Sequence, residues 1–87
     1  MDSSDYNIRF SRKAQKDIAE LTLQQKSKLK QILERFISVN PYCGKALKGK
    51  PKGLYSYRLN RKDRILYEIF DDDRSVLIIR TKIHYGE

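Results

Sequence analysis

The apolar positions near the start of the chain follow first the period of a strand and then that of a helix. Between residues 6 and 10, Tyr6, Ile8 and Phe10 alternate with polar side chains, which predicts a half-buried strand. Ser11 comes next, and its hydroxyl can cap the first turn of a helix. The apolar residues that follow recur at helical spacing and predict one buried stripe, formed by Ala14, Ile18 and Leu21.

A second helix is predicted to begin at a capping box. Thr22 and Gln25 have the spacing at which a hydroxyl and an amide side chain satisfy each other's backbone N–H groups. The apolar side chains of the following turns form its predicted buried stripe: Leu29, Ile32, Leu33, Phe36 and Ile37. Asn40 and Pro41 end the helix, because a residue before proline is displaced from the helical region.

The second half of the chain is predicted to contain a loop and three strands. Residues 43–53 hold three glycines and a proline, which disfavour regular structure. Residues 54–59, 64–70 and 76–83 are rich in β-forming side chains, and the last run is the most apolar, as in a central strand. The order β-α-α-β-β-β predicts one α+β domain over residues 1–87. Its two N-terminal helices would pack on one face of a small, mainly antiparallel sheet, leaving the other face freer to bind a ligand.

Chain length and charge indicate what that ligand is. A chain of 87 residues has one small core, so we expect a shallow surface groove and no enclosed cofactor. The net charge is +8, and residues 44–64 hold eight basic side chains with Asp63 as the only acid. Such a concentration of positive charge is typical of proteins that bind a polyanion, although a solvated lysine-rich loop is the alternative interpretation.

The rare residue types exclude several other classes. Cys43 is the only cysteine and His84 the only histidine, so one chain cannot form an internal disulfide or the usual tetrahedral zinc site. No apolar run is long enough to span a membrane, and the first five residues are polar and acidic, unlike a secretory signal. We therefore expect a cytoplasmic protein that binds neither a metal nor a membrane.

Five short segments, in register along nearly the whole chain, resemble the RelE/ParE toxins, and most closely the YoeB/Txe branch. They are FSRKAQKD at residues 10–17, LKG at 47–49, YSYRL at 55–59, DRILY at 63–67 and the terminal IHY at 83–85. The resemblance implies the RelE-like microbial ribonuclease fold. It also implies the toxin of a toxin–antitoxin pair: a metal-independent endoribonuclease (an mRNA interferase) that cleaves messenger RNA in the ribosomal A site.

Cleavage of RNA without a metal uses the 2′-hydroxyl as nucleophile and needs a base, an acid and cations at the phosphate. His84 is the candidate acid, because imidazole exchanges protons near neutral pH and the resemblance gives that role to this position. Tyr85 is the candidate for stacking on a base or bonding to a phosphate. The alternative is that His84 is a tail residue without a role and that Tyr85 lies in a frayed terminus or contacts a partner.

Two arginines are candidates for binding the scissile phosphate, since a guanidinium offers two parallel donors to phosphate oxygens. Arg64 begins a predicted strand and matches an arginine of the family, and Arg58 could face it across a hairpin. The alternative for Arg64 is an ion pair with Asp63 or Glu68.

The remaining basic residues of this region are candidates for RNA binding: Lys45, Lys48, Lys50, Lys52, Arg61 and Lys62. In YoeB-type toxins the resemblance places a glutamate, the general base, two residues before the Leu-Lys pair, but Lys45 stands there in this chain. The base is therefore left open between a lysine, Asp63 and Glu68, and a weak nuclease is a further alternative.

Two other functions fit part of the pattern. A ParE-like inhibitor would bind DNA gyrase without catalysis and would not need Arg58, Arg64, His84 or Tyr85. A basic nucleic-acid-binding module would show steep salt dependence and no cleavage. The expected partners are a cognate acidic antitoxin that covers residues 44–64, messenger RNA and the ribosome, and self-association as a homodimer stays open.

Overall fold

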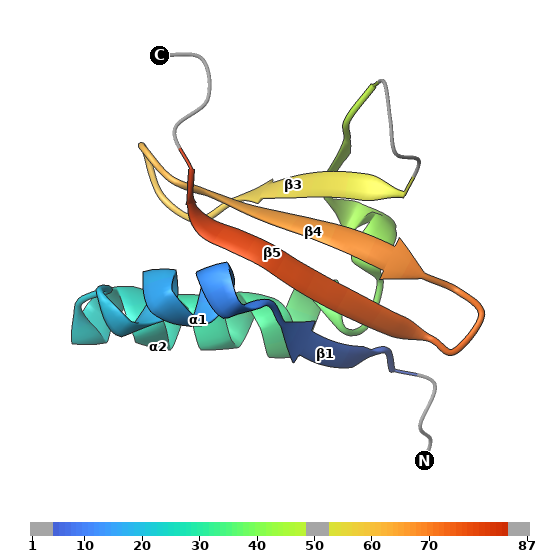
Figure 1. Ribbon diagram of the computed structural model, residues 1–87, viewed down its shortest axis with the longest axis horizontal. Helices are drawn as coiled ribbons and strands as arrows, with labels where there is room; N and C mark the ends of the chain where they lie inside the picture. The colour runs from blue at the N-terminus through green and yellow to red at the C-terminus, as the bar shows by residue number, and fades with distance from the viewer. Residues whose placement is uncertain (1–4, 49–52, 84–87) are drawn as a thin grey trace.

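The computed structural model of the protein describes residues 5–48 and 53–83 and consists of one sheet with two helices on one side of it (Figure 1). The predicted order of helices and strands is confirmed, with one addition. The elements are β1 (Asn7–Phe10), α1 (Arg12–Ala19), α2 (Leu23–Ile32), β2 (Lys45–Ala46), β3 (Leu54–Arg58), β4 (Arg64–Phe70) and β5 (Ser75–Ile83). The addition is β2, which lies inside the segment predicted to be irregular.

The five strands lie in the order β1-β5-β4-β3-β2. β2, β3, β4 and β5 pair antiparallel in succession, in agreement with the predicted mainly antiparallel sheet, whereas β1 runs parallel to β5. The sheet is therefore mixed. β5 lies between β1 and β4 as an interior strand, but the middle position belongs to β4, not to β5 as its hydropathy suggested.

Both helices begin where the sequence predicts. The Ser11 hydroxyl accepts a hydrogen bond from Ala14 N at 3.0 Å, and Thr22 and Gln25 form the complete capping box. The apolar stripes of the helices pack against one face of the sheet. The core contains these fully buried residues: Ala14, Ile37, Leu59, Ile65, Tyr67, Val76 and Ile78.

One residue of the predicted helical stripe lies elsewhere. α2 continues into a π-helical segment, Leu33–Ile37, followed by a short 3-10 turn, Pro41–Cys43. The wider π turn rotates the side chains out of the regular helical phase. As a result Ile37 is buried, while Phe36 is 48% exposed and stacks on Tyr57 with ring centroids 6.2 Å apart.

Candidate functional site

The hairpin between β3 and β4 brings the two candidate arginines together. Arg58 and Arg64 are direct cross-strand partners at its turn end, where they flank residues 59–63. The connecting turn is held by Asn60, whose side-chain oxygen accepts hydrogen bonds from Lys62 N at 2.9 Å and Asp63 N at 2.8 Å. Because this local turn fixes the register of the hairpin, the two guanidinium groups start from facing positions.

A hollow of about 620 Å³ adjoins this arginine pair. It is lined by three cations and by four uncharged residues: Lys45, Arg58 and Arg64, with Cys43, Gly44, Ser56 and Tyr57. Lys45 arrives from β2, where it is the cross-strand partner of Ser56. The short added strand therefore carries one predicted RNA-binding residue to the edge of the arginine pair, and we call this hollow the cationic cavity.

The lining of the cationic cavity includes no acidic side chain from the described ranges. Two ion pairs in those ranges, Arg80–Asp17 and Lys82–Glu20, join β5 to α1. Neither Asp63 nor Glu68 lines the cavity, and Glu68 forms no ion pair with Arg64 within the described ranges. Like charges that face each other across strands repel unless an anion lies between them. The arrangement therefore suits a phosphate, which a guanidinium fork and an ammonium bind well.

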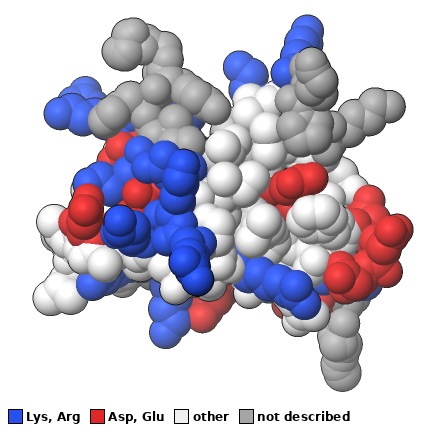
Figure 2. Space-filling model, in the orientation of Figure 1, with Lys and Arg blue, Asp and Glu red and all other residues white. Residues whose placement is uncertain are grey.

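The charges of the molecule are unevenly distributed in space as well as in sequence. In the view of Figure 2, Lys and Arg side chains gather toward the end of the molecule that carries α1. Acidic side chains gather at the opposite end, over the turn between β4 and β5 that holds Asp71, Asp72 and Asp73. A polyanion is thus attracted to one end and repelled from the other.

The other predicted site residues fall into two groups. Arg61 and Lys62 lie exposed in the turn of the same hairpin, and Lys48 lies exposed beyond β2. His84, Tyr85, Lys50 and Lys52 lie outside the described residues. Ile83, which precedes His84 in the sequence, is the Cα partner of Arg64.

Sequence patterns had not indicated the uncharged lining of the cavity. Ser56 shares the Arg58 face of β3, so strand alternation could have identified it. Cys43 and Gly44 reach the cavity only through the pairing of β2 with β3, which the composition of that segment disfavours. Partial burial of its sulfur atom raises the pKa of the Cys43 thiol and so disfavours the reactive thiolate.

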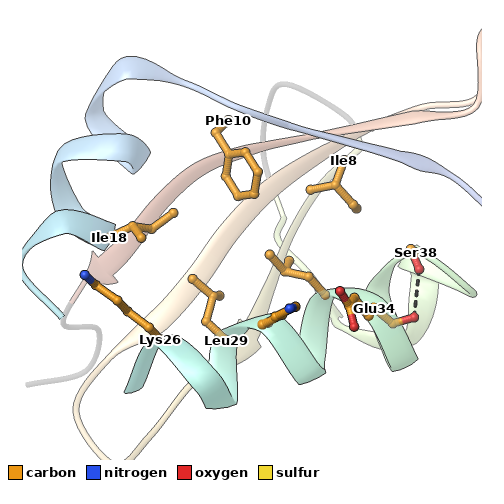
Figure 3. Close-up of a pocket in the computed structure, with 9 residues that line it drawn as sticks. Ile8, Phe10, Ile18, Lys26, Leu29, Glu34 and Ser38 are labelled. Atoms are coloured by element: carbon orange, nitrogen blue, oxygen red, sulfur yellow. Dashed lines mark hydrogen bonds between the residues drawn. The ribbon is translucent and has the colours of Figure 1, made fainter. Parts of the chain in front are cut away.

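A second hollow, of about 350 Å³, lies between β1, α1 and α2 (Figure 3). Its floor is apolar and includes Ile8, Phe10 and Leu29, whereas Lys26, Lys30, Glu34 and Ser38 add polar groups. The Ser38 hydroxyl donates to the Glu34 carbonyl at 2.9 Å. None of the predicted site residues lines this hollow, so it is distinct from the cationic cavity.

Two further properties concern only the described part of the chain. It has no cluster of three or more His, Cys, Asp or Glu side chains that could hold a metal ion. It also has no helix with the length and apolar character needed to cross a bilayer.

Comparison with known proteins agrees with this fold. Among solved structures, the protein is similar to a chain of the RelBE2 toxin–antitoxin complex of Mycobacterium tuberculosis. The two chains are 28% identical with a TM-score of 0.79, and the match covers 93% of this chain and 99% of that chain. The protein is similar to the YoeB dimer of Staphylococcus aureus, with 28% identity, a TM-score of 0.77 and coverage of 94% and 100%. No curated protein sequence matches.

The family comparison covers almost the whole chain. Residues 8–84 match the family described as the ParE toxin of the type II toxin–antitoxin system parDE. This match confirms the resemblance to RelE/ParE toxins that the sequence motifs indicated. The chain therefore belongs to the ParE toxin family of type II toxin–antitoxin systems.

Proposed function

We propose that this toxin is a metal-independent endoribonuclease that cleaves messenger RNA, in the ribosomal A site, through attack of the 2′-hydroxyl. The observation that carries the proposal is the cationic cavity, in which Arg58, Arg64 and Lys45 converge. No carboxylate of the described residues lines this cavity. Cations held in place before the reaction stabilise the extra negative charge of the phosphorane transition state. The similarity to RelE and YoeB structures supports the same assignment.

The roles follow from the chemistry of each group. Arg64 and Arg58 would bind the non-bridging oxygens of the scissile phosphate as forks. His84, next in the sequence to the Cα partner of Arg64, would protonate the leaving 5′-oxygen, and Tyr85 would stack on a neighbouring base. Lys45 lines the cavity where Asp63 and Glu68 do not, so we assign it the proton-accepting or phosphate-binding role near the 2′-hydroxyl.

The test is a cell-free bacterial translation reaction in which messenger 5′ ends are mapped by primer extension. Wild-type protein should create new ends inside codons at the A site, and Arg64→Ala or His84→Ala should reduce them by about 100-fold, the usual effect of removing one transition-state contact. Arg9→Ala is the matched control, because Arg9 is an exposed arginine on β1 at the other edge of the sheet. Intact messenger with wild-type protein would refute the nuclease.

A second candidate is inhibition of DNA gyrase without catalysis, which the match to the ParE toxin family favours. This candidate predicts loss of supercoiling activity in a purified gyrase assay with no RNA cleavage. It also predicts that Arg64→Ala and His84→Ala leave the inhibition of gyrase unchanged. The two assays run on the same variants separate the candidates, because only the nuclease requires the cationic cavity for bond cleavage.

The proposed partners are those of a cytoplasmic toxin. An acidic antitoxin would cover residues 44–64, and messenger RNA on the ribosome would bind the same surface through its phosphates. Relatives in similar solved structures occur as toxin–antitoxin complexes, and YoeB of Staphylococcus aureus occurs as a dimer. Size-exclusion chromatography with light scattering would decide whether this chain also forms a homodimer.

A further inference from the structure

We propose that Tyr67 is a positioning residue, whose buried hydroxyl holds the segment 41–45 so that Lys45 reaches the cationic cavity. This inference rests on the proposed function of that cavity. Tyr67 lies in β4, at the centre of the sheet, and its side chain is completely buried. Its hydroxyl donates a hydrogen bond of 2.6 Å to the carbonyl of Pro41, so a central strand bonds directly to the segment that leads to Lys45.

The same hydroxyl lies against Gly44. A Cβ atom on residue 44 would lie only 2.3 Å from the Tyr67 oxygen and 2.6 Å from the carbonyl oxygen of Ser56. The φ angle of Gly44 is −80°, which any residue can adopt, so glycine is needed here for space and not for its backbone freedom. The backbone at residue 44 is therefore seated between the phenol hydroxyl and β3.

The Tyr67 hydroxyl stays protonated and can therefore donate this hydrogen bond. Burial raises the pKa of the Tyr67 phenol well above its ordinary value, so the hydroxyl keeps its proton at neutral pH. A tyrosine stack supports the ring, because Tyr55 lies 6.0 Å from Tyr67 and Tyr42 packs edge-on against Tyr55 at 5.5 Å. The Tyr42 hydroxyl donates to Asp71, which attaches the same segment to the turn after β4.

The contacts of Tyr67 with Pro41 and Gly44 determine where Lys45 lies. Lys45 directly follows Gly44 and is the Cα partner of Ser56, two residues before Arg58 on β3. β2 has only two residues, so its ladder alone gives little rigidity. A shift at Pro41 or Gly44 would therefore move the Lys45 ammonium relative to Arg58 and Arg64 in the cationic cavity.

The experiment is a double-mutant cycle between Tyr67→Phe and Lys45→Ala. The measured quantity is the affinity for a fluorescent 2′-O-methyl single-stranded RNA, which binds but cannot be cleaved by its own 2′-hydroxyl. Tyr55→Phe is the matched control, because it also removes a phenol hydroxyl from the tyrosine stack. The Tyr55 hydroxyl makes no hydrogen bond within the described residues. Unfolding midpoints of all variants report any general loss of stability.

We expect Tyr67→Phe to weaken RNA binding about fivefold in the wild-type background and less than about twofold in the Lys45→Ala background, because contacting or coupled residues are not additive. Tyr55→Phe should leave the affinity unchanged in both backgrounds. An equal loss in both backgrounds would overturn the proposal, since Tyr67 would then act on the fold rather than through Lys45.

The alkylation rate of Cys43 independently measures how firmly the segment 41–45 is held, because this sole cysteine is exposed within that segment. Tyr67→Phe should increase the rate with iodoacetamide, and Tyr55→Phe should not. Wild-type protein that fails to bind this RNA would argue against phosphate binding in the cationic cavity, and the Cys43 rates would then decide the inference alone. Equal rates in the two variants would overturn it.

Discussion

At the scale of single residues, one carboxylate joins the helical layer to the strand that leads toward His84. Asp17 in α1 is only 7% exposed and accepts hydrogen bonds from Arg80 Nε at 2.8 Å, from the terminal nitrogen of Arg80 at 3.1 Å and from Thr81 N at 3.1 Å. The hydrogen bonds from Arg80 are the main reason why the pKa of Asp17 lies below its ordinary range, although burial opposes them. The apolar stripe of α1 does not reveal this role.

The Asp17→Asn variant should lower the free energy of unfolding by about 2 kcal/mol at pH 7, because it removes a charge-assisted, largely buried pair while Arg80 keeps partial access to water. Urea unfolding between pH 7 and pH 2 measures the effect. A carboxyl with a lowered folded pKa stabilises the protein above its unfolded pKa of about 3.9, and this stabilisation is lost as the pH falls through the folded pKa. The difference between wild type and variant should therefore shrink below about pH 4.

Asp72→Asn is the control for that prediction, because Asp72 lies exposed in the turn after β4 and makes no ion pair within the described residues. It should leave both the stability at pH 7 and its pH dependence within about 0.5 kcal/mol of wild type. A constant difference between wild type and Asp17→Asn down to pH 2 would contradict the assigned role of the charge.

At the scale of elements, two similar helix caps have different connections. The Thr22 hydroxyl accepts from Gln25 N at 3.1 Å, and its partners all belong to the start of α2. The Ser11 hydroxyl caps α1 and also donates to the carbonyl of Ile79 in β5 at 2.8 Å. Ser11 therefore joins a helix to the sheet, which its sequence pattern as an N-cap does not show.

The Thr22→Ala and Ser11→Ala variants should consequently differ. Loss of the Thr22 cap should cost about 1 kcal/mol of stability, the usual effect of an N-cap. Loss of the Ser11 hydroxyl should cost about 2 kcal/mol, because it also leaves the Ile79 carbonyl without that donor. Thermal or urea unfolding of the two single variants provides the comparison, and equal losses would show that the bond to β5 contributes nothing.

At the scale of the whole molecule, the net charge of +8 determines how it responds to polyanions. The cationic cavity uses only part of this charge, since Arg61 and Lys62 lie in the adjoining turn and other basic side chains gather over the α1 end. The attraction is therefore both long-range and local. Long-range attraction is screened by salt, whereas a contact in the cavity is screened less.

The salt dependence of RNA binding measures the local part. For single strands, each neutralised phosphate contributes about 0.7 to the slope of log affinity against log salt. The Arg58→Ala/Arg64→Ala double variant should therefore reduce the slope by about 0.7 if both arginines bind one phosphate, and by about 1.4 if they bind two. The Arg9→Ala/Arg35→Ala variant removes two exposed arginines that do not line the cavity and serves as the control. Identical slopes for the two double variants would argue against a defined phosphate site.

An acidic antitoxin should stabilise this toxin. A partner that binds only the folded state at 100 times its Kd adds about 2.7 kcal/mol to the free energy of unfolding. In a domain of this size, that addition should raise the Tm by about 10 °C or more. Thermal unfolding with and without a saturating cognate antitoxin tests this expectation, and an unchanged Tm would show that the antitoxin does not bind the folded toxin.

The sequence by itself determined the features that depend on neighbouring residues. Strand and helix periods, the Ser11 and Thr22 caps and the turn between β3 and β4 involve residues a few positions apart, so the fold class and the Arg58–Arg64 pair could be predicted. The charge of residues 44–64 can be counted directly along the chain, and that count indicates a polyanion partner without excluding a solvated lysine-rich loop.

Only the tertiary structure decided the contacts between distant segments. The parallel pairing of β1 with β5, the strand formed by Lys45 and Ala46, and the bond between Asp17 and Arg80 each join residues that no local pattern relates. The close contact between Gly44 and the Tyr67 hydroxyl also joins residues that are distant in the sequence. Such contacts arise when the whole chain packs around one core, where available space and unpaired backbone groups, rather than local preference, determine which residues meet.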